Sequence, residues 1–364
     1  MPPVTLFRYI AVRTLLGIGG LLVILSSLVL LVDLIENMRF VSKINNGDFN
    51  FALHLTLLRT PALAQALIPF VFLFGSIWMF HQLNKRSEIS VMRSAGLSVW
   101  RLIGPPSLIA ALAGFLLITI IDPLSAGLLS QAETLKYRKQ GAEKNLVRIF
   151  DDGIWLRQRD ASGQLLINAT SYDDERAALE TVTVWRFDKE NAFLERIDAS
   201  QAFLSGRTLE LHDAKLRSPD NDAERYTPIY AVGTSLTAAN LRERVAPPET
   251  MSLWRLPQYI ILADAAGLPT ARYNIRFHEL CATPLKLLAM VLIAAAFSMR
   301  PPRAGGAVEL VVLSILAGFM LYLLSEISTA LGESGFAPEA LAAWTPAIVA
   351  SLAAITALLH LEDG

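Results

Sequence analysis

The sequence predicts a membrane protein in which two groups of three helices flank an all-β domain. Two observations on composition lead to this fold class. Hydrophobic residues make up 53% of the 364-residue chain and charged residues only 18%, whereas soluble domains carry about 25% charged residues. The charges are also unevenly spread, because 43 of the 65 Asp, Glu, Lys and Arg residues fall between residues 122 and 279. The chain is therefore apolar at both ends and polar in the middle.

The apolar ends contain six runs that can each span a membrane. A spanning helix needs about 20 apolar residues, because its backbone hydrogen bonds must be satisfied within the segment. The runs cover residues 15–32, 62–80, 102–121, 280–299, 307–325 and 341–360. Lys286 and Glu309 are the only charged residues inside them. The first run is too long for a signal peptide and has no small-residue cleavage site, so we expect a retained anchor.

Lysine and arginine residues in the short loops predict the orientation of these helices. With the N-terminus in the cytoplasm, the cytoplasmic segments hold Arg8, Arg13, Lys85, Arg86, Arg93, Arg101, Arg300 and Arg303. The opposite side holds only Arg39, Lys43 and Arg59. We therefore expect a multi-pass protein with both termini in the cytoplasm and the central domain outside it.

The central region predicts a β-sandwich or jelly roll. Five short segments are mostly rich in β-branched or aromatic residues, and turn-prone clusters separate several of them. They are residues 153–159, 165–169, 181–187, 209–213 and 229–232. Trp155 and Trp185 alternate with polar neighbours, so we expect them in the β core. Residues 131–144 have a helix-forming composition and extend the third membrane helix, while Pro247, Pro248 and Pro257 break the chain before it returns to the membrane.

These elements divide the chain into three parts. Residues 1–122 form membrane helices 1–3 with a short cytoplasmic helix near residues 86–96, residues 123–272 form the β domain with its helical extension, and residues 273–364 form membrane helices 4–6.

Several classes of function lack support in the sequence. The chain contains no phosphate-binding loop of the type G-x-x-x-x-G-K-[ST], no H-E-x-x-H and no G-x-S-x-G, so it carries no motif for ATP hydrolysis, zinc proteolysis or nucleophile-elbow hydrolysis. A net charge of −1 argues against a nucleic-acid binder. The single Cys281 excludes an intrachain disulfide and a cysteine-based zinc site. We expect no metal site and a transport protein rather than an enzyme.

The loop between helices 2 and 3 predicts a short helix of its own. Ser87 is a candidate N-cap, Glu88 lies in the first turn where the helix dipole favours an anion, and Gly96 is a candidate C-cap. The apolar residues of the segment form a strip suited to a groove on a partner: Ile89, Val91 and Met92. The alternative is that the segment only turns the chain at the membrane surface.

With this loop, the chain resembles the inner-membrane permease subunits of the lipopolysaccharide export ATP-binding cassette transporter. The resemblance rests on Arg86-Ser-Glu-Ile-Ser-Val-Met-Arg-Ser-Ala-Gly96, on the order of three helices, a β domain and three helices, and on the closing Leu359-His-Leu-Glu-Asp-Gly364. It covers essentially the whole chain. The fourth helix and the C-terminus are more similar to the G-type than to the F-type paralogue.

The resemblance implies a complex in the bacterial inner membrane. Its expected partners are a paralogous permease subunit in a heterodimer, a dimeric cytoplasmic ATPase and a single-span periplasmic bridge protein. Lipopolysaccharide would leave the outer leaflet of the inner membrane and enter the periplasmic β-jelly roll, which begins a bridge used in outer-membrane biogenesis. The partner ATPase would use ATP and Mg, and this chain would bind no cofactor itself.

The resemblance also assigns candidate roles to residues. The family's coupling glutamate falls at Glu88, with Arg93 and Arg86 as further contacts of the ATPase. Basic residues near the outer interface or within helix 4 are candidate contacts for lipopolysaccharide phosphates, namely Arg39, Lys43, Lys136, Arg138 and Lys286. Relatives often carry a lysine near the outer end of helix 1, but residues 27–32 here are only Ser, Leu and Val. Asp33 and Glu326 are candidates for a lateral gate.

Two other interpretations remain open. A permease of another ATP-binding cassette exporter for lipids or lipoproteins would share the coupling helix without an open β-jelly roll. A non-transporting scaffold with a periplasmic recognition domain would be insensitive to a change at Glu88. An ion-driven carrier is disfavoured because Lys286 and Glu309 make no evident relay.

Overall fold

The computed structural model describes residues 3–43, 48–139, 145–150, 153–160, 163–173, 176, 178–188, 190, 192–205, 208–219, 221–234, 247–299 and 307–363. The chain forms two compact units. The helical unit comprises Met1–Ala132, Ser252–Trp254 and Asn274–Gly364, and the β unit comprises Glu133–Met251 and Arg255–Tyr273. Each unit has its own hydrophobic core.

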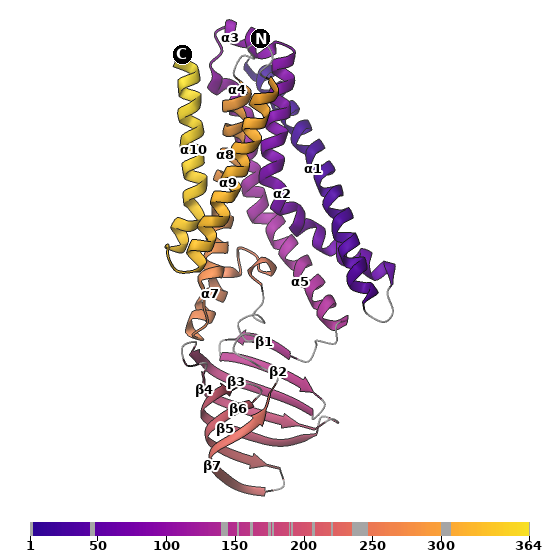
Figure 1. Cartoon of the computed structure of the whole chain (residues 1–364), viewed down its shortest axis with the longest axis vertical. Helices are drawn as coiled ribbons and strands as arrows, with labels where there is room; N and C mark the ends of the chain where they lie inside the picture. The colour runs from indigo at the N-terminus through magenta and orange to yellow at the C-terminus, as the bar shows by residue number, and fades with distance from the viewer. Residues whose placement is uncertain are drawn as a thin grey trace. The chain divides into compact units, whose positions relative to one another are not determined.

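The helices follow the apolar runs and extend beyond them (Figure 1). They are α1 (Pro3–Ser42), α2 (Phe49–Lys85), α3 (Glu88–Ser94), α4 (Val99–Leu116), α5 (Asp122–Lys139), α7 (Leu256–Ala265), α8 (Ala271–Ser298), α9 (Ala307–Glu333) and α10 (Glu339–Asp363). A π-helical segment, Leu117–Ile121, joins α4 to α5, so that Val99–Lys136 is one continuous candidate span. In the described residues six helices are long and apolar enough to cross a membrane, which confirms the six predicted runs.

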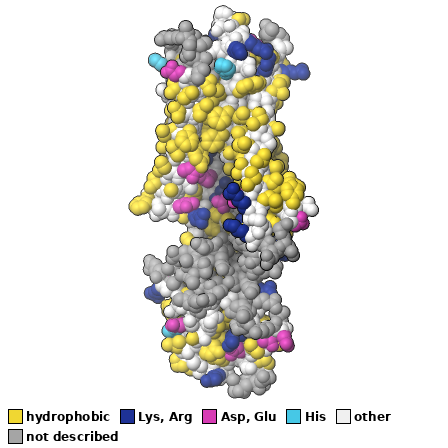
Figure 2. Space-filling model, turned by 45° about the vertical axis from the view of Figure 1, so that its right-hand side comes forward, with side chains coloured by type: hydrophobic (Ala, Val, Ile, Leu, Met, Phe, Trp, Pro, Cys, Tyr) yellow, Lys and Arg dark blue, Asp and Glu magenta, His cyan; other side chains and the backbone are white. Residues whose placement is uncertain are grey.

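The outer surface of the helical unit is apolar over a broad band (Figure 2). Lys and Arg side chains gather at one end of this band, and a mixture of acidic and basic side chains lies at the other (Figure 2). We call the first the α3 end, because α3 and both ends of the chain lie there (Figure 1), and the second the far end. Several leucine, valine and isoleucine side chains along α1 are more than half exposed, including Leu16, Val23 and Leu31. Such a surface suits lipid or a membrane partner.

The described residues of the β unit form one seven-stranded antiparallel sheet. Its strands are β1 (Asn145–Phe150), β2 (Gly153–Asp160), β3 (Gly163–Asp173), β4 (Ala178–Phe187), β5 (Phe193–Ser205), β6 (Thr208–Ser218) and β7 (Asn221–Gly233). Every described strand pairs with its neighbours in sequence (Figure 1). The all-β domain is confirmed. Its connectivity differs from a Greek-key jelly roll, because short connections place each strand beside the preceding one.

A single transverse row of irregular residues bends this sheet. The row consists of Thr170, Thr181, Ser200, Asp213 and Pro228, which lie opposite one another on β3 to β7 and interrupt the ladder in each pair. Thr181 and Asp213 have φ of 48° and 55°, and a proline has no N–H to donate. We call this row the crease.

The crease changes which side chains face inward. Buried residues normally alternate along a strand, but here they are three positions apart across the row. The pairs are Ala169 and Tyr172, Leu179 and Val182, Ala199 and Ala202, and Leu211 and Ala214. Inward-facing residues from both sides of the crease belong to one core. The two halves of each creased strand therefore face each other across one core, as two separate sheets do in a jelly roll.

The two tryptophans lie on the outer face of the sheet, so the prediction that they belong to the core is wrong. The inward positions beside them are taken by Ile154, Leu156 and Val184. The rings of Trp155 and Trp185 stack on each other with centroids 5.4 Å apart, and the guanidinium of Arg196 lies 5.7 Å from the Trp185 ring. Aromatic stacking on the solvent side gives the same alternating pattern as core packing.

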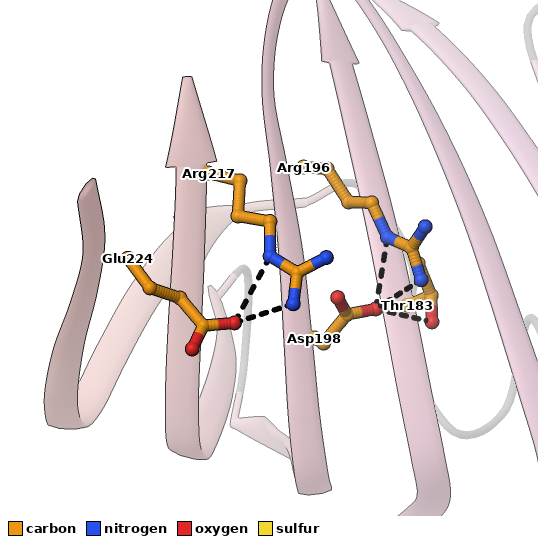
Figure 3. Close-up of polar contacts among 5 residues, drawn as sticks. All are labelled: Thr183, Arg196, Asp198, Arg217 and Glu224. Atoms are coloured by element: carbon orange, nitrogen blue, oxygen red, sulfur yellow. Dashed lines mark hydrogen bonds and ion pairs between the residues drawn. The ribbon is translucent and has the colours of Figure 1, made fainter. Parts of the chain in front are cut away.

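Polar contacts within β5 and between neighbouring strands continue along this outer face (Figure 3). Asp198 accepts hydrogen bonds from Thr183 at 2.8 Å and from Arg196 at 2.9 and 3.0 Å, and Arg217 donates to Glu224 at 2.9 Å. Ion pairs whose side chains remain accessible to water contribute little to stability.

Helix α7 covers the β core. The backbone N–H of Tyr172, beside the crease, donates to the Ala266 carbonyl at 2.8 Å, and Ala263, Ala266 and Leu268 join the core. Pro257 lies in the first turn of α7, where its missing N–H leaves no bond unmade. The proline expected to break the chain therefore begins a helix.

Candidate functional site

The short predicted helix exists as α3 and ends in a Schellman motif. The N–H of Gly96 donates to the Arg93 carbonyl at 3.0 Å, and the N–H of Leu97 donates to the Met92 carbonyl at 3.1 Å. Gly96 adopts φ of 80°, which a residue with a Cβ rarely adopts. The predicted N-cap differs: Ser87 precedes the helix with φ of 57° and its side chain makes no capping hydrogen bond.

Glu88 is held by the first membrane helix. Its Oε2 accepts a hydrogen bond of 2.7 Å from the Tyr9 hydroxyl, and the Arg13 guanidinium lies 5.2 Å from the Tyr9 ring. Oε1 accepts no hydrogen bond from any residue that the structure describes. The half-buried carboxylate is thus fixed in position by one oxygen and keeps the other for a further donor.

The two arginines near Glu88 are both exposed. Arg86 is the C-cap of α2. Arg93 donates from Nη2 to the carbonyl of Leu361 at 3.4 Å, which links the end of α3 to the end of α10. Contacts thus join α3 to α1 at its start and to α10 at its end.

The apolar strip expected on α3 divides between the protein core and solvent. Ile89 is 3% exposed and, with half-buried Met92, packs in the core of the helical unit. Only Val91, at 65% exposure, faces outward. Ile89 and Met92 fix α3 to the membrane helices, so a partner would meet Val91 and the polar residues around it.

The candidate gate residue Asp33 is buried in an ion pair at the far end. Its carboxylate lies 3.0 Å from Nη1 of Arg59, and it accepts a hydrogen bond of 2.7 Å from Asn37. Asn37 also donates to Thr56 Oγ1 at 2.9 Å. These contacts join the last third of α1 to the first turns of α2. Burial makes the pair sensitive to loss of either partner.

A second buried carboxylate, Asp122, was not predicted. It is 1% exposed and accepts hydrogen bonds from Gln65 Nε2 at 3.3 Å, Arg276 Nη2 at 3.3 Å and the backbone N–H of Leu253 at 2.9 Å. Ser125 donates to Gln65 Oε1 at 2.6 Å. This network joins α2, α5, α8 and the segment at 252–254.

One sequence signal could have indicated this network. Asp122 directly follows the third apolar run, and α8 carries polar residues at helical spacing, which places them on one face. They are Arg272, Arg276, Glu279, Thr283 and Lys286. An amphipathic stripe inside a membrane span indicates contacts with other helices or with a polar ligand. The pairing with Asp122 itself comes from the fold, because 154 residues separate the partners.

The other candidate residues lie at separate places. Arg39 and Lys43 are exposed at the end of α1, and Lys136 and Arg138 lie in the last turn of α5. Lys286 is half-buried on α8 and forms no ion pair within the described part of the chain. Glu326 is exposed on α9, where it interacts with Tyr322. On the same face of α8, Glu279 accepts a hydrogen bond of 2.8 Å from Thr329 of α9.

The fold and these sites define a class: a multi-pass membrane protein with an all-β domain inserted between its third and fourth spans. The family model described as lipopolysaccharide export system permease LptF/LptG matches residues 8–360. The chain belongs to this family, and its class is therefore that of a lipopolysaccharide export permease, a transport protein.

Two relatives have similar length and share a quarter of the residues. The lipopolysaccharide export system permease protein LptG of Haemophilus influenzae is 25% identical over 336 residues, covering 89% of each chain. The protein of the same name in Escherichia coli K12 is 25% identical over 342 residues, covering 90% of each chain.

Proposed function

We propose that this chain is the G-type permease subunit of an ATP-driven lipopolysaccharide exporter in the bacterial inner membrane. It pairs with a paralogous permease, rests on a dimeric cytoplasmic ATP-binding cassette ATPase and joins a single-span periplasmic bridge protein. The α3 end faces the cytoplasm and the β unit the periplasm. The complex takes lipopolysaccharide from the outer leaflet of the inner membrane and passes it to the β bridge.

Family membership supports the transported lipid, and the two relatives named LptG support the paralogue. The observation that carries the coupling step is the environment of Glu88. A carboxylate in the first turn of α3, held by Tyr9 through one oxygen, offers its second oxygen to a basic group of the ATPase. The partner ATPase uses ATP and Mg, and we propose no cofactor site on this chain. Arg86 and Arg93 are further contacts.

Basic residues outside α3 are proposed to contact the phosphates of the lipid. They are Arg39, Lys43, Lys136, Arg138 and Lys286. We propose Asp33 as a lateral-gate residue because its ion pair with Arg59 fixes α1 to α2. We propose Glu326 as a second lateral-gate residue because it is exposed on α9.

The coupling step is tested by co-purifying the ATPase with wild type, Glu88→Ala and Glu88→Gln. Because a charge-assisted contact is lost, both variants should retain the ATPase about tenfold less well or worse. Ser90→Ala, at an exposed position of the same helix, is the matched control. Normal retention by both Glu88 variants, with unchanged lipopolysaccharide release from proteoliposomes, would show that α3 does not couple.

A further inference from the structure

Three contacts fix α1 along its length, and together they form a mechanical connection from α3 to the far end. We propose that Tyr9 is the positioning residue through which α3 moves α1, and that α1 and the first turns of α2 turn as one arm about the contact between Gly17 and Gly75. The inference rests on the coupling role proposed for Glu88. It adds the path by which movement of α3 reaches the far end.

The first contact joins the arm to α3. The hydroxyl of Tyr9 donates to Glu88 at 2.7 Å, so a force on Glu88 acts directly on α1. Arg13, one turn further along α1, lies over the Tyr9 ring at 5.2 Å and helps to hold the ring in place. A hydrogen bond to a charged group is among the stronger single contacts between helices.

The second contact is the pivot, where the backbones of α1 and α2 touch. A Cβ on Gly17 would lie 2.8 Å from the Gly75 carbonyl oxygen, and a Cβ on Gly75 would lie 2.9 Å from the Ile18 Cα. Both atoms belong to the backbone and cannot rotate away. The Trp78 ring and the Ile18 side chain flank this contact but do not separate the two backbones, so one helix can turn against the other at this point. Gly19 and Gly20 have no atom within 4 Å of such a Cβ.

The third contact locks the far end of the arm. Asp33 and Asn37 of α1 bind Arg59 and Thr56 of α2 through the buried ion pair and hydrogen bonds described above. This lock alone would prevent α1 from moving against a rigid α2.

Helix α2 contains two prolines between the lock and the pivot. Pro61 and Pro69 lie inside α2, and each removes a helical hydrogen bond and permits a bend. The segment before Pro61 can therefore move with α1. Figure 1 shows α1 and the first part of α2 diverging from α8, α9 and α10 toward the far end.

The geometry gives the ratio between the movements at the two ends of the arm. Gly17 follows Tyr9 by eight residues and precedes Asp33 by sixteen, which correspond to about 12 Å and about 24 Å at 1.5 Å per residue. A displacement of about 1.5 Å at Tyr9 therefore becomes about 3 Å at Asp33. A shift of this size at the far end would open or close a space beside α1.

The experiment compares wild type with Tyr9→Phe, Gly17→Ala and Glu88→Ala in the full complex with ATPase and paralogous permease. Tyr9→Phe keeps the ring and removes only the hydroxyl. Gly17→Ala fills the pivot, and Gly20→Ala is its control, because it adds the same methyl group to α1 at an open position. Spin labels at Leu31→Cys and Leu341→Cys, both exposed far from α3, report the far end in a Cys281→Ser background.

In wild type and Gly20→Ala, trapping the ATPase with ATP and vanadate should shift the distance between the labels by about 3 Å. Tyr9→Phe and Gly17→Ala should retain the ATPase, lose this shift and release lipopolysaccharide about tenfold more slowly. If both behave as wild type while Glu88→Ala is uncoupled, the arm is wrong and the proposed function stands. If Glu88→Ala also behaves as wild type, the coupling role itself is wrong. An equal defect in Gly20→Ala would overturn the pivot.

Discussion

At the scale of single residues, the buried carboxylates Asp33 and Asp122 hold the far end of the helical unit. Both lie where an apolar run ends, and each has a guanidinium partner on another helix. The sequence indicates the acidic residues but not their partners, because Arg59 and Arg276 also satisfy the ordinary pattern of basic residues flanking a span. Burial of 96% and 99% distinguishes these groups from interfacial charges that reach water.

Removing the Asp122 carboxylate should destabilise the helical unit. Asp122→Ala leaves Arg276 and the Leu253 N–H without their acceptor, and loss of one partner of a buried pair costs about 3 kcal/mol or more. Asp122→Asn keeps one oxygen and should cost less. Thermal unfolding in detergent measures the difference, with Glu36→Ala, an exposed carboxylate on α1, as control. Equal melting temperatures for Asp122→Ala and Glu36→Ala would contradict the network.

The crease gives the β unit a pH-dependent contact. Hydrogen bonds from Tyr226 and Ser200 hold the pKa of Asp213 below its usual value. A carboxyl group with a lowered folded-state pKa stabilises the fold above the unfolded-state pKa, about 4, and loses this effect as the pH falls through the folded value. Tyr226→Phe should therefore lower the melting temperature slightly at pH 7, with the difference from wild type shrinking below about pH 4. A difference that does not change with pH would exclude this linkage.

At the scale of elements, the predicted strands show where sequence patterns reach their limit. The segments 165–169 and 209–213 end at the crease, and 181–187 and 229–232 begin at it. Each prediction recovered only the part of an observed strand on one side of the crease, because an alternating pattern can be followed only until its phase changes. β5 was missed because Ile197 is its one β-branched residue, and α7 was missed because Pro257 was interpreted as a break. The six membrane helices were predicted well, since length and hydrophobicity alone define a span.

Substitutions at the crease test its strain. Thr181 has φ of 48°, which costs an L-residue roughly 1–2 kcal/mol, so Thr181→Gly should leave the β unit as stable as wild type or stabilise it by up to about 1 kcal/mol. Thr183→Gly, at an extended position of the same strand that also bonds Asp198, should destabilise it by about 1 kcal/mol. Thermal unfolding of both variants measures these changes in stability. Equal losses would mean that the crease stores no strain.

The same limit applies to α3 and its surroundings. The sequence predicts the helix, its C-terminal glycine and the acidic residue in its first turn. It cannot predict that Ile89 and Met92 turn inward, or that Tyr9 reaches Glu88, because 79 residues separate Tyr9 from Glu88 and only the fold brings them together. The interpretation of α3 as a docking strip thus changes to a helix bound to α1 and α10, with Glu88 and Val91 left to a partner.

At the scale of the whole molecule, the two units divide the proposed work. The helical unit provides the spans, the α3 contact and the arm, and the β unit provides a bent sheet with one apolar core. If a partner ATPase drives transport, contact between the lipid and the β unit should depend on ATP. Tyr230 lies at the edge of that core, packed against its buried residues, and Tyr226 is 58% exposed on the same strand.

The most direct measurement therefore places a photo-crosslinking phenylalanine analogue at Tyr230 and, as control, at Tyr226, in the full complex with lipopolysaccharide in proteoliposomes. We expect a lipopolysaccharide adduct at Tyr230 that forms with ATP, is absent without ATP and does not form at Tyr226. An adduct that forms equally without ATP, or none at Tyr230 in a complex that hydrolyses ATP, would contradict ATP-driven export through this chain.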